Sequence, residues 1–209
     1  MTRPLREARI DLGAIRSNVA VLKEAVTPAA AMVVVKAGGY GHGAEEVARA
    51  AVDGGADWLG VVDVEEAEAL DPSPYAVVVV GGSIHVNGHQ PALRAWLGRF
   101  GEALDPARTA LFSVSLTAAD DSDEGREAAG EYVRALATDA GVTPALASAF
   151  AGALQYREYP LPTRVLVKLI ARHRGLSTDA SIDADYTDWA AVDAFADEVA
   201  GLVPRAVAA

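Results

Sequence analysis

Short apolar runs rich in valine alternate along this chain with segments of helical periodicity. This alternation indicates parallel βαβ units, in which helices cover both faces of a sheet. A strand buried on both faces reads as a continuous apolar run, and A-M-V-V-V-K at 31–36 is one such run. We predict five central strands, at Ala31–Lys36, Trp58–Val64, Tyr75–Val80, Thr109–Leu116 and Ala145–Leu154.

The length of the chain decides between two parallel α/β architectures. An eight-stranded α/β barrel typically needs about 250 residues, whereas this chain has 209. We therefore predict a single α/β domain over 1–209 with a doubly wound five-stranded parallel sheet. An extra N-terminal strand at Ala8–Leu12 and a helix at Gly13–Ala25 are expected to precede it.

Composition excludes several classes of function. The net charge is −11, and the chain has no cysteine and four histidines. A general nucleic-acid binder needs a basic face, and disulfides, thiolate metal sites and cysteine nucleophiles need cysteine. We expect no metal site. The polar first residues and the absence of an apolar run near the roughly 20 residues of a membrane span predict a cytoplasmic protein.

A glycine-rich segment, K-A-G-G-Y-G-H-G-A, follows the strand that ends at Lys36. Glycines let the backbone approach a ligand closely, and amides at a helix N-terminus suit an anion. The alternative is a flexible strand-to-helix turn. Lys36 itself is either a lysine that forms a Schiff base or a solvated strand end. The candidate binding residues are Gly38, Gly39, Tyr40, Gly41, His42 and Gly43.

Two further strand ends carry polar residues. The loop after Val80, G-G-S-I-H-V-N-G-H-Q-P, is longer than a turn requires and can line a planar heteroaromatic ligand. Ser113, Ser115 and Thr117 alternate at the end of the Thr109–Leu116 strand, and strand-end capping is the alternative explanation there. No G-x-S-x-G elbow supports a serine nucleophile.

The segment Thr163–Arg174 predicts a basic amphipathic helix with Arg164, Lys168 and Arg172 on one face. Such a helix can lie on an anionic membrane surface or contact a membrane quinone, and a solvated basic face is the alternative.

The first third of the chain resembles the alanine racemase N-terminal barrel domain. Glu7–Val19 resembles that family's opening strand and helix, and Val34–Ala44 resembles its pyridoxal phosphate motif. The resemblance implies that Lys36 forms the internal aldimine with pyridoxal phosphate. The family has an aspartate or asparagine where this chain has Gly38.

The rest of the chain, from about residue 75 to 203, is similar to the flavodoxin-like, quinone-dependent protoporphyrinogen oxidase family. The similar stretches are Tyr75–Gln90, Leu111–Ala118, Ala151–Tyr159, Val167–Arg172 and Tyr186–Trp189. This resemblance implies a sheet of order 2-1-3-4-5, FMN as cofactor and a basic helix linked with membrane quinone. It implies that the flavin ring contacts Gly82, Ser83, Ile84, His85, Ser113, Val114, Ser115 and Leu116.

The two resemblances together indicate a chimera, with a racemase-like segment at 1–71 completing a flavodoxin-like segment at 72–209. We rank an FMN-binding oxidoreductase first, with either a small redox partner or a membrane quinone. Its phosphate site lacks serine and threonine hydroxyls, which contribute about 1.5–3 kcal/mol each to a charged phosphate. The alternatives are a pyridoxal phosphate binder through Lys36 and an inert scaffold. Racemase activity is not expected, because most of the barrel is missing.

Overall fold

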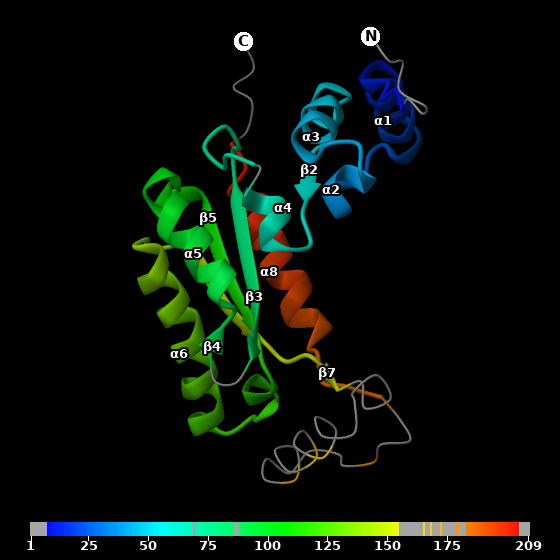
Figure 1. Ribbon diagram of the computed structural model, residues 1–209. Coiled ribbons are helices and arrows are strands. Elements are labelled where there is room, and N and C mark those ends of the chain that lie inside the picture. Colours follow the sequence, from blue (N-terminus) through cyan, green and yellow to red (C-terminus); the bar gives the residue numbers. More distant parts are fainter. Residues whose placement is uncertain are drawn as a thin grey trace. The chain divides into compact units, whose positions relative to one another are not determined.

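The computed structural model describes residues 8–68, 70–85, 88–154, 165, 168, 172, 179 and 183–204. The chain divides into two compact units, Met1–Asp71 and Pro72–Ala209. Figure 1 shows the elements of each unit along the sequence.

The first unit pairs two short parallel strands and covers them with helices. Its elements are α1 (Leu12–Val26), β1 (Met32–Val34), α2 (Ala37–Tyr40), α3 (Ala44–Asp53), β2 (Trp58–Gly60) and α4 (Val64–Glu68). In the β1–β2 pair, Val33 stands opposite Leu59. Small residues allow α1 to approach α3 closely, since Ala48 and Ala51 are fully buried. A Cβ at Gly54 would lie 2.6 Å from the Arg16 carbonyl oxygen of α1.

The second unit contains a four-stranded sheet of order β4-β3-β5-β6. Strands β3, β5 and β6 are parallel, and β4 pairs with β3 in an antiparallel hairpin. These strands are β3 (Val78–His85), β4 (Gly88–His89), β5 (Thr109–Val114) and β6 (Leu146–Phe150). The helices are α5 (Pro91–Phe100), α6 (Asp123–Ala140) and α8 (Trp189–Gly201), and β7 (Ala153–Leu154) pairs with β8 (Ala184–Asp185).

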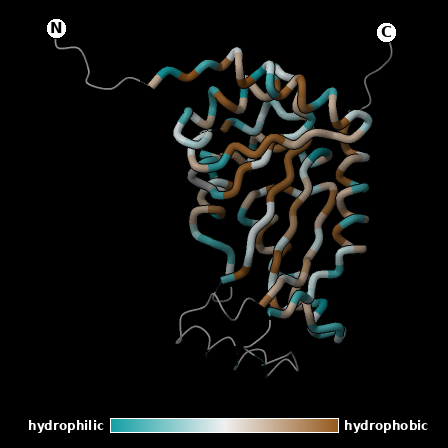
Figure 2. The backbone as a smooth tube through the Cα atoms, turned by 90° about the vertical axis from the view of Figure 1, so that its right-hand side faces the viewer, coloured by the Kyte–Doolittle hydropathy of each residue, from teal (hydrophilic) through white to brown (hydrophobic). Residues whose placement is uncertain are grey.

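Helices α5 and α6 cover one face of this sheet and α8 covers the other (Figure 1). On the α8 face, Phe195 meets Phe112 and Phe150 edge-on, with ring centroids 6.2 and 5.5 Å apart. On the opposite face, Leu97, Leu111 and Leu136 are fully buried. The strands form a hydrophobic layer in the interior, as the brown segments of Figure 2 show. Each unit therefore has apolar side chains buried within it.

The predicted flavodoxin-like sheet of order 2-1-3-4-5 is wrong. Four of the predicted strands contain β1, β2, β5 and β6, and the fifth, Tyr75–Val80, overlaps only the start of β3. Within the described residues, however, β1 pairs only with β2. A doubly wound sheet requires β1 to pair with β3, whose pairing partners here are β5 and β4. Strands β1 and β2 are three residues long each, and they pair with each other inside the first unit.

The extra N-terminal strand predicted at Ala8–Leu12 is also absent. Residues 8–11 have no regular secondary structure, and Asp11 is instead the N-cap of α1, accepting a hydrogen bond from the Ala14 amide. An aspartate in this position favours a helix start over a strand. Among the described helices, none has the length and apolar character that crossing a membrane requires.

Candidate functional site

Lys36 stands just beyond the carboxyl end of β1, and its side chain is exposed. Its Nζ lies 5.9 Å from the centroid of the Tyr40 ring. No carboxylate in the described part of the chain forms an ion pair with it. Lys23, by contrast, places its Nζ 2.6 Å from the Asp57 carboxylate. Of these two lysines, Lys36 therefore has the amine that is accessible to an aldehyde.

The residues after Lys36 form one left-handed helical turn. Five consecutive residues have φ between 53° and 79°: Ala37, Gly38, Gly39, Tyr40 and Gly41. The turn is closed by hydrogen bonds from the Tyr40 amide to the Lys36 carbonyl and from the Gly41 amide to the Ala37 carbonyl, both 2.9 Å. Left-handed backbone costs a residue with a Cβ about 1–2 kcal/mol, so the glycines supply most of this turn without strain.

Gly39 has a second role, because it is buried against α3. A Cβ there would lie 3.0 Å from a methyl group of Val47. The turn is therefore both closed by its own hydrogen bonds and packed on a helix, which gives Lys36 a defined backbone support.

Glu66 supports the same turn from the second strand. It lies in α4, shortly after β2, and is 8% exposed. One carboxylate oxygen accepts a hydrogen bond from the Ala37 amide, and the other accepts one from the Val62 amide at 3.0 Å. The bond from Val62 does most to hold the pKa of this carboxyl below its ordinary value; the Ala37 amide and the Lys36 charge add to it, and burial opposes them.

The backbone amides of the glycine-rich segment are largely used inside it. The His42 amide donates to the Gly39 carbonyl at 3.1 Å, and the Gly43 amide donates to the Gly38 carbonyl at 2.9 Å. The first turn of α3 carries Glu45 and Glu46. These carboxylates favour the helix N-terminus but repel an anion there. Lys36 is accordingly the residue of this segment best placed to hold a cofactor.

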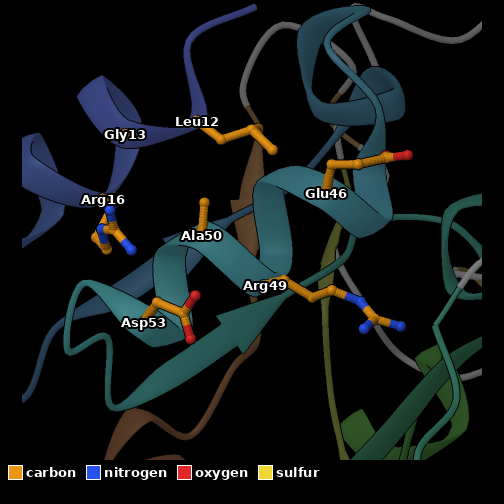
Figure 3. Close-up of a pocket in the computed structure, with 7 residues that line it drawn as sticks. All are labelled: Leu12, Gly13, Arg16, Glu46, Arg49, Ala50 and Asp53. Atoms are coloured by element: carbon orange, nitrogen blue, oxygen red, sulfur yellow. The ribbon is translucent and has the colours of Figure 1, made fainter.

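A hollow of about 300 Å³ lies between α1 and α3 (Figure 3). Its lining includes Arg16, Glu46, Arg49 and Asp53, two cationic and two anionic side chains. Arg49 extends away from Arg16 and Asp53 in Figure 3. Neither Lys36 nor the left-handed turn lines this hollow. Its mixed charge does not select a phosphate.

The other predicted site residues lie in the second unit, on neighbouring strands. Gly82 stands opposite Ser113, and Ser83 stands opposite Val114. The Ser83 hydroxyl and His85 Nε2 are 2.8 Å apart, and Ser115 Oγ accepts a hydrogen bond from the Ala118 amide. Ile84 pairs with His89 of β4, and Leu116 begins a short 3-10 helix. The prediction that Gly81–Pro91 is a loop is therefore wrong, because β3 continues to His85 and then pairs with β4. The predicted residues Gly82–His85 and Ser113–Val114 lie on the paired strands β3 and β5.

The predicted basic helix falls mostly outside the described residues. Lys168 and Arg172 are helical, and Arg164 lies outside the described residues. Contact of this face with a membrane or a quinone stays a prediction.

Sequence reasoning missed Glu66, although a local signal was present. The run D-V-E-E at 63–66 has the D-x-x-E spacing of a capping box. Asp63 does accept a hydrogen bond from the Glu66 amide at 2.9 Å. The Glu66 side chain, however, reaches Ala37 and Val62, and spacing along the chain does not reveal those long-range partners.

Comparison with known proteins finds similarity to alanine racemases and to a protoporphyrinogen IX dehydrogenase. The family model described as "Alanine racemase, N-terminal domain" matches residues 10–100. An alanine racemase of Mycolicibacterium vanbaalenii is 42% identical over 140 residues, covering 63% of this chain and 36% of that protein. The protoporphyrinogen IX dehydrogenase [quinone] of Leishmania major is 34% identical over 147 residues, covering 70% of this chain and 63% of that protein. The chain thus spans less than two thirds of the length of either relative.

A shorter stretch is more similar still to an alanine racemase. The enzyme of Symbiobacterium thermophilum is 54% identical over 63 residues, covering 30% of this chain and 17% of that protein. Among solved structures, the alanine racemase from Streptomyces coelicolor A3(2) is 27% identical, covers 80% of this chain and 51% of that chain, and has a TM-score of 0.39.

These findings correct the functional prediction. The family model includes Lys36 and the whole glycine-rich segment, and several relatives are alanine racemases. The prediction of an FMN-binding, flavodoxin-like oxidoreductase is therefore wrong, and so is FMN as the first choice of cofactor. The expectation that the chain has no racemase activity is also wrong. The alternative, a pyridoxal phosphate-binding protein that uses Lys36, is better supported.

Proposed function

We propose that this chain is an alanine racemase-like protein that binds pyridoxal phosphate covalently through Lys36. The observation that carries the proposal is the exposed Lys36 amine at the carboxyl end of β1, supported by a turn that Glu66 and α3 hold in place. Ligands of parallel α/β proteins bind at this end of the strands. The match of the racemase family model to residues 10–100 supports the same choice.

When bound, pyridoxal phosphate stabilises negative charge at the Cα of an amino acid and so makes its proton removable. Lys36 binds the cofactor through Nζ, and the same atom can take or return the Cα proton once an amino acid has displaced it. The centroid of the Tyr40 ring lies 5.9 Å from Nζ, within reach of a cation–π interaction. We propose amino-acid racemisation, with alanine as the first substrate to test, as the reaction class. Inversion requires that Cα be reprotonated on the face opposite Lys36, and solvent water is the donor proposed there.

The first test is a spectroscopic titration of the full chain with pyridoxal phosphate. We expect the visible absorbance band of a lysine Schiff base in the wild type and its loss in Lys36→Ala. Lys23→Ala is the matched control, because Lys23 lies in the same unit but is paired with Asp57. A band that is absent from the wild type, or that persists in Lys36→Ala, contradicts the proposal.

The second test addresses the reaction. Wild-type protein loaded with the cofactor is incubated with L-alanine in deuterated water, and exchange at Cα is followed by NMR. We expect exchange that Lys36→Ala abolishes, accompanied by formation of D-alanine. If the protein binds the cofactor but shows no exchange at Cα, the racemase proposal fails. The proposal that Lys36 binds pyridoxal phosphate would still stand.

We also propose that the chain joins two segments of different origin, 1–71 and 72–209. The division into compact units between Asp71 and Pro72 supports this boundary. The similarities to alanine racemases and to a protoporphyrinogen IX dehydrogenase support two origins. The position of the boundary rests on the compact units, since the racemase family model extends to residue 100.

A further inference from the structure

The Glu66 carboxylate joins two loops that are far apart in the sequence. Its two oxygens accept hydrogen bonds from Ala37, which directly follows Lys36, and from Val62, which follows β2. These loops leave the carboxyl ends of the two paired strands. One buried side chain therefore fixes both loops at the edge of the sheet where Lys36 stands.

The turn that follows Lys36 needs such a fixed point. Ala37 and Tyr40 have φ of 53° and 56°, although neither is glycine. A left-handed backbone persists at such residues only when the surroundings hold it. The hydrogen bond from the Ala37 amide to Glu66 holds the first residue of the turn, and Gly39 packing on Val47 holds its middle.

The contacts require a carboxylate and not merely a polar side chain of the same size. Both oxygens act as acceptors for backbone N–H groups. A glutamine has one acceptor oxygen, and its NH₂ group would face a second donor. Hydrogen bonds to ionised acceptors are also stronger than neutral ones.

We propose that Glu66 is a positioning residue that holds the Lys36 amine in the geometry in which it reacts with the aldehyde of pyridoxal phosphate. This rests on the proposed function, and it adds a residue outside the glycine-rich segment to the site. Glu66 acts through the backbone at Ala37 and makes no contact with the cofactor in this scheme.

The experiment compares labelling of two lysines in one molecule. Full-length protein is treated with limiting pyridoxal phosphate, reduced with borohydride and digested, and modified Lys36 and Lys23 are quantified by mass spectrometry. In Glu66→Gln we expect the labelling of Lys36 to fall about tenfold at unchanged labelling of Lys23, the effect of losing one charged hydrogen bond. Glu68→Gln, an exposed position on the same helix, is the matched control and should leave the ratio unchanged.

A purely structural role for Glu66 gives a different result. General loosening of the first unit would free Lys23 from Asp57 and lower the ratio by raising the labelling of Lys23. The proposal instead requires the labelling of Lys36 itself to fall while that of Lys23 stays unchanged. An unchanged ratio in a folded Glu66→Gln protein, or a fall matched by Glu68→Gln, overturns the proposal.

A measurement on the wild type covers the case in which Glu66→Gln does not fold. Hydrogen exchange followed by NMR should show the Ala37 and Val62 amides protected, with proton shifts downfield as expected for bonds to a carboxylate. Exchange of both at the rate of open amides overturns the proposal. If wild-type Lys36 does not bind pyridoxal phosphate, the proposed function fails; the amide measurement and acylation of Lys36 by acetic anhydride still decide whether Glu66 positions this lysine.

Discussion

His89 is a buried histidine without a hydrogen-bond partner for Nε2 among the described residues. It is 8% exposed, and its ring lies over Gly82, where a Cβ would be 2.9 Å from His89 Cδ2. Burial is the main cause that lowers the pKa of His89 below 6.5; Arg94 also lowers it, and Asp139 opposes both. The fold therefore holds the neutral imidazole.

This predicts a pH dependence of stability with a definite sign. Below pH 6.5 the unfolded chain binds a proton at His89 that the folded chain resists, so the unfolded state gains stability as pH falls. The contribution is fully present above that pH and is lost as pH drops toward the folded pKa. Urea unfolding between about pH 7.5 and about pH 5.5 should show a declining free energy for the second unit.

His89→Gln provides the control, since glutamine does not titrate. Its unfolding free energy should change less over the same pH range than that of the wild type, because carboxylates elsewhere titrate equally in both proteins. An identical slope in the two proteins would show that His89 is not the group responsible.

At the scale of a single element, the left-handed turn after β1 depends on glycine for backbone reasons alone. A Cβ at Gly38 would meet no atom within 4 Å, yet φ there is 61°. We expect Gly38→Ala to lower the unfolding free energy of the first unit by about 1–2 kcal/mol. The variant should also weaken pyridoxal phosphate binding at Lys36, which a spectroscopic titration measures.

Gly98 is the comparison for this substitution. It lies inside α5, and a Cβ there also meets nothing within 4 Å. Gly98→Ala should stabilise the second unit by about 0.5–1 kcal/mol, since alanine favours a helix. Destabilisation by both substitutions would show that the added methyl group, and not the sign of φ, causes the effect.

Helices and strands could be predicted from the sequence where a local hydrophobic pattern determines them. The valine-rich runs placed β1, β2 and β5 within a few residues of their observed bounds, whereas β3 continues through Gly81–His85, where the glycines suggested a loop. The run Ala145–Leu154 splits into β6 and β7 because the chain leaves the sheet at Ala151 and Gly152. Strand pairing was not predictable, since apolar runs of similar composition fit several partners and only long-range packing selects one.

The candidate site shows the same limit. Lys36 and the glycines after it were found because they are contiguous in the sequence. Glu66 was missed because its partners at Ala37 and Val62 depend on how β1 and β2 pair. The polar residues after Val80 and Phe112 lie on the paired strands β3 and β5 and not in loops, and their polar character suggested a flavin that the comparisons do not support.

At the scale of the whole molecule, the two units differ in what fills their cores. The first is packed with small side chains such as Ala48 and Ala51, and the second with Leu97, Leu111 and Leu136. A single-domain chain predicts one cooperative unfolding transition. Two joined segments, each with its own core, predict two transitions, and we expect two in a calorimetric scan.

If the two units unfold separately, Leu111→Ala should shift the unfolding transition of the second unit. Pyridoxal phosphate should shift that of the first. Leu111 is fully buried in the second unit, so its truncation should destabilise that unit by about 2–5 kcal/mol. Pyridoxal phosphate at about a hundredfold excess over its Kd should stabilise the first unit by about 2.7 kcal/mol. Calorimetry of wild type and Leu111→Ala, each with and without the cofactor, should show one transition moved by the substitution and the other by the ligand. A single transition moved by both would mean that residues 1–71 and 72–209 unfold as one domain.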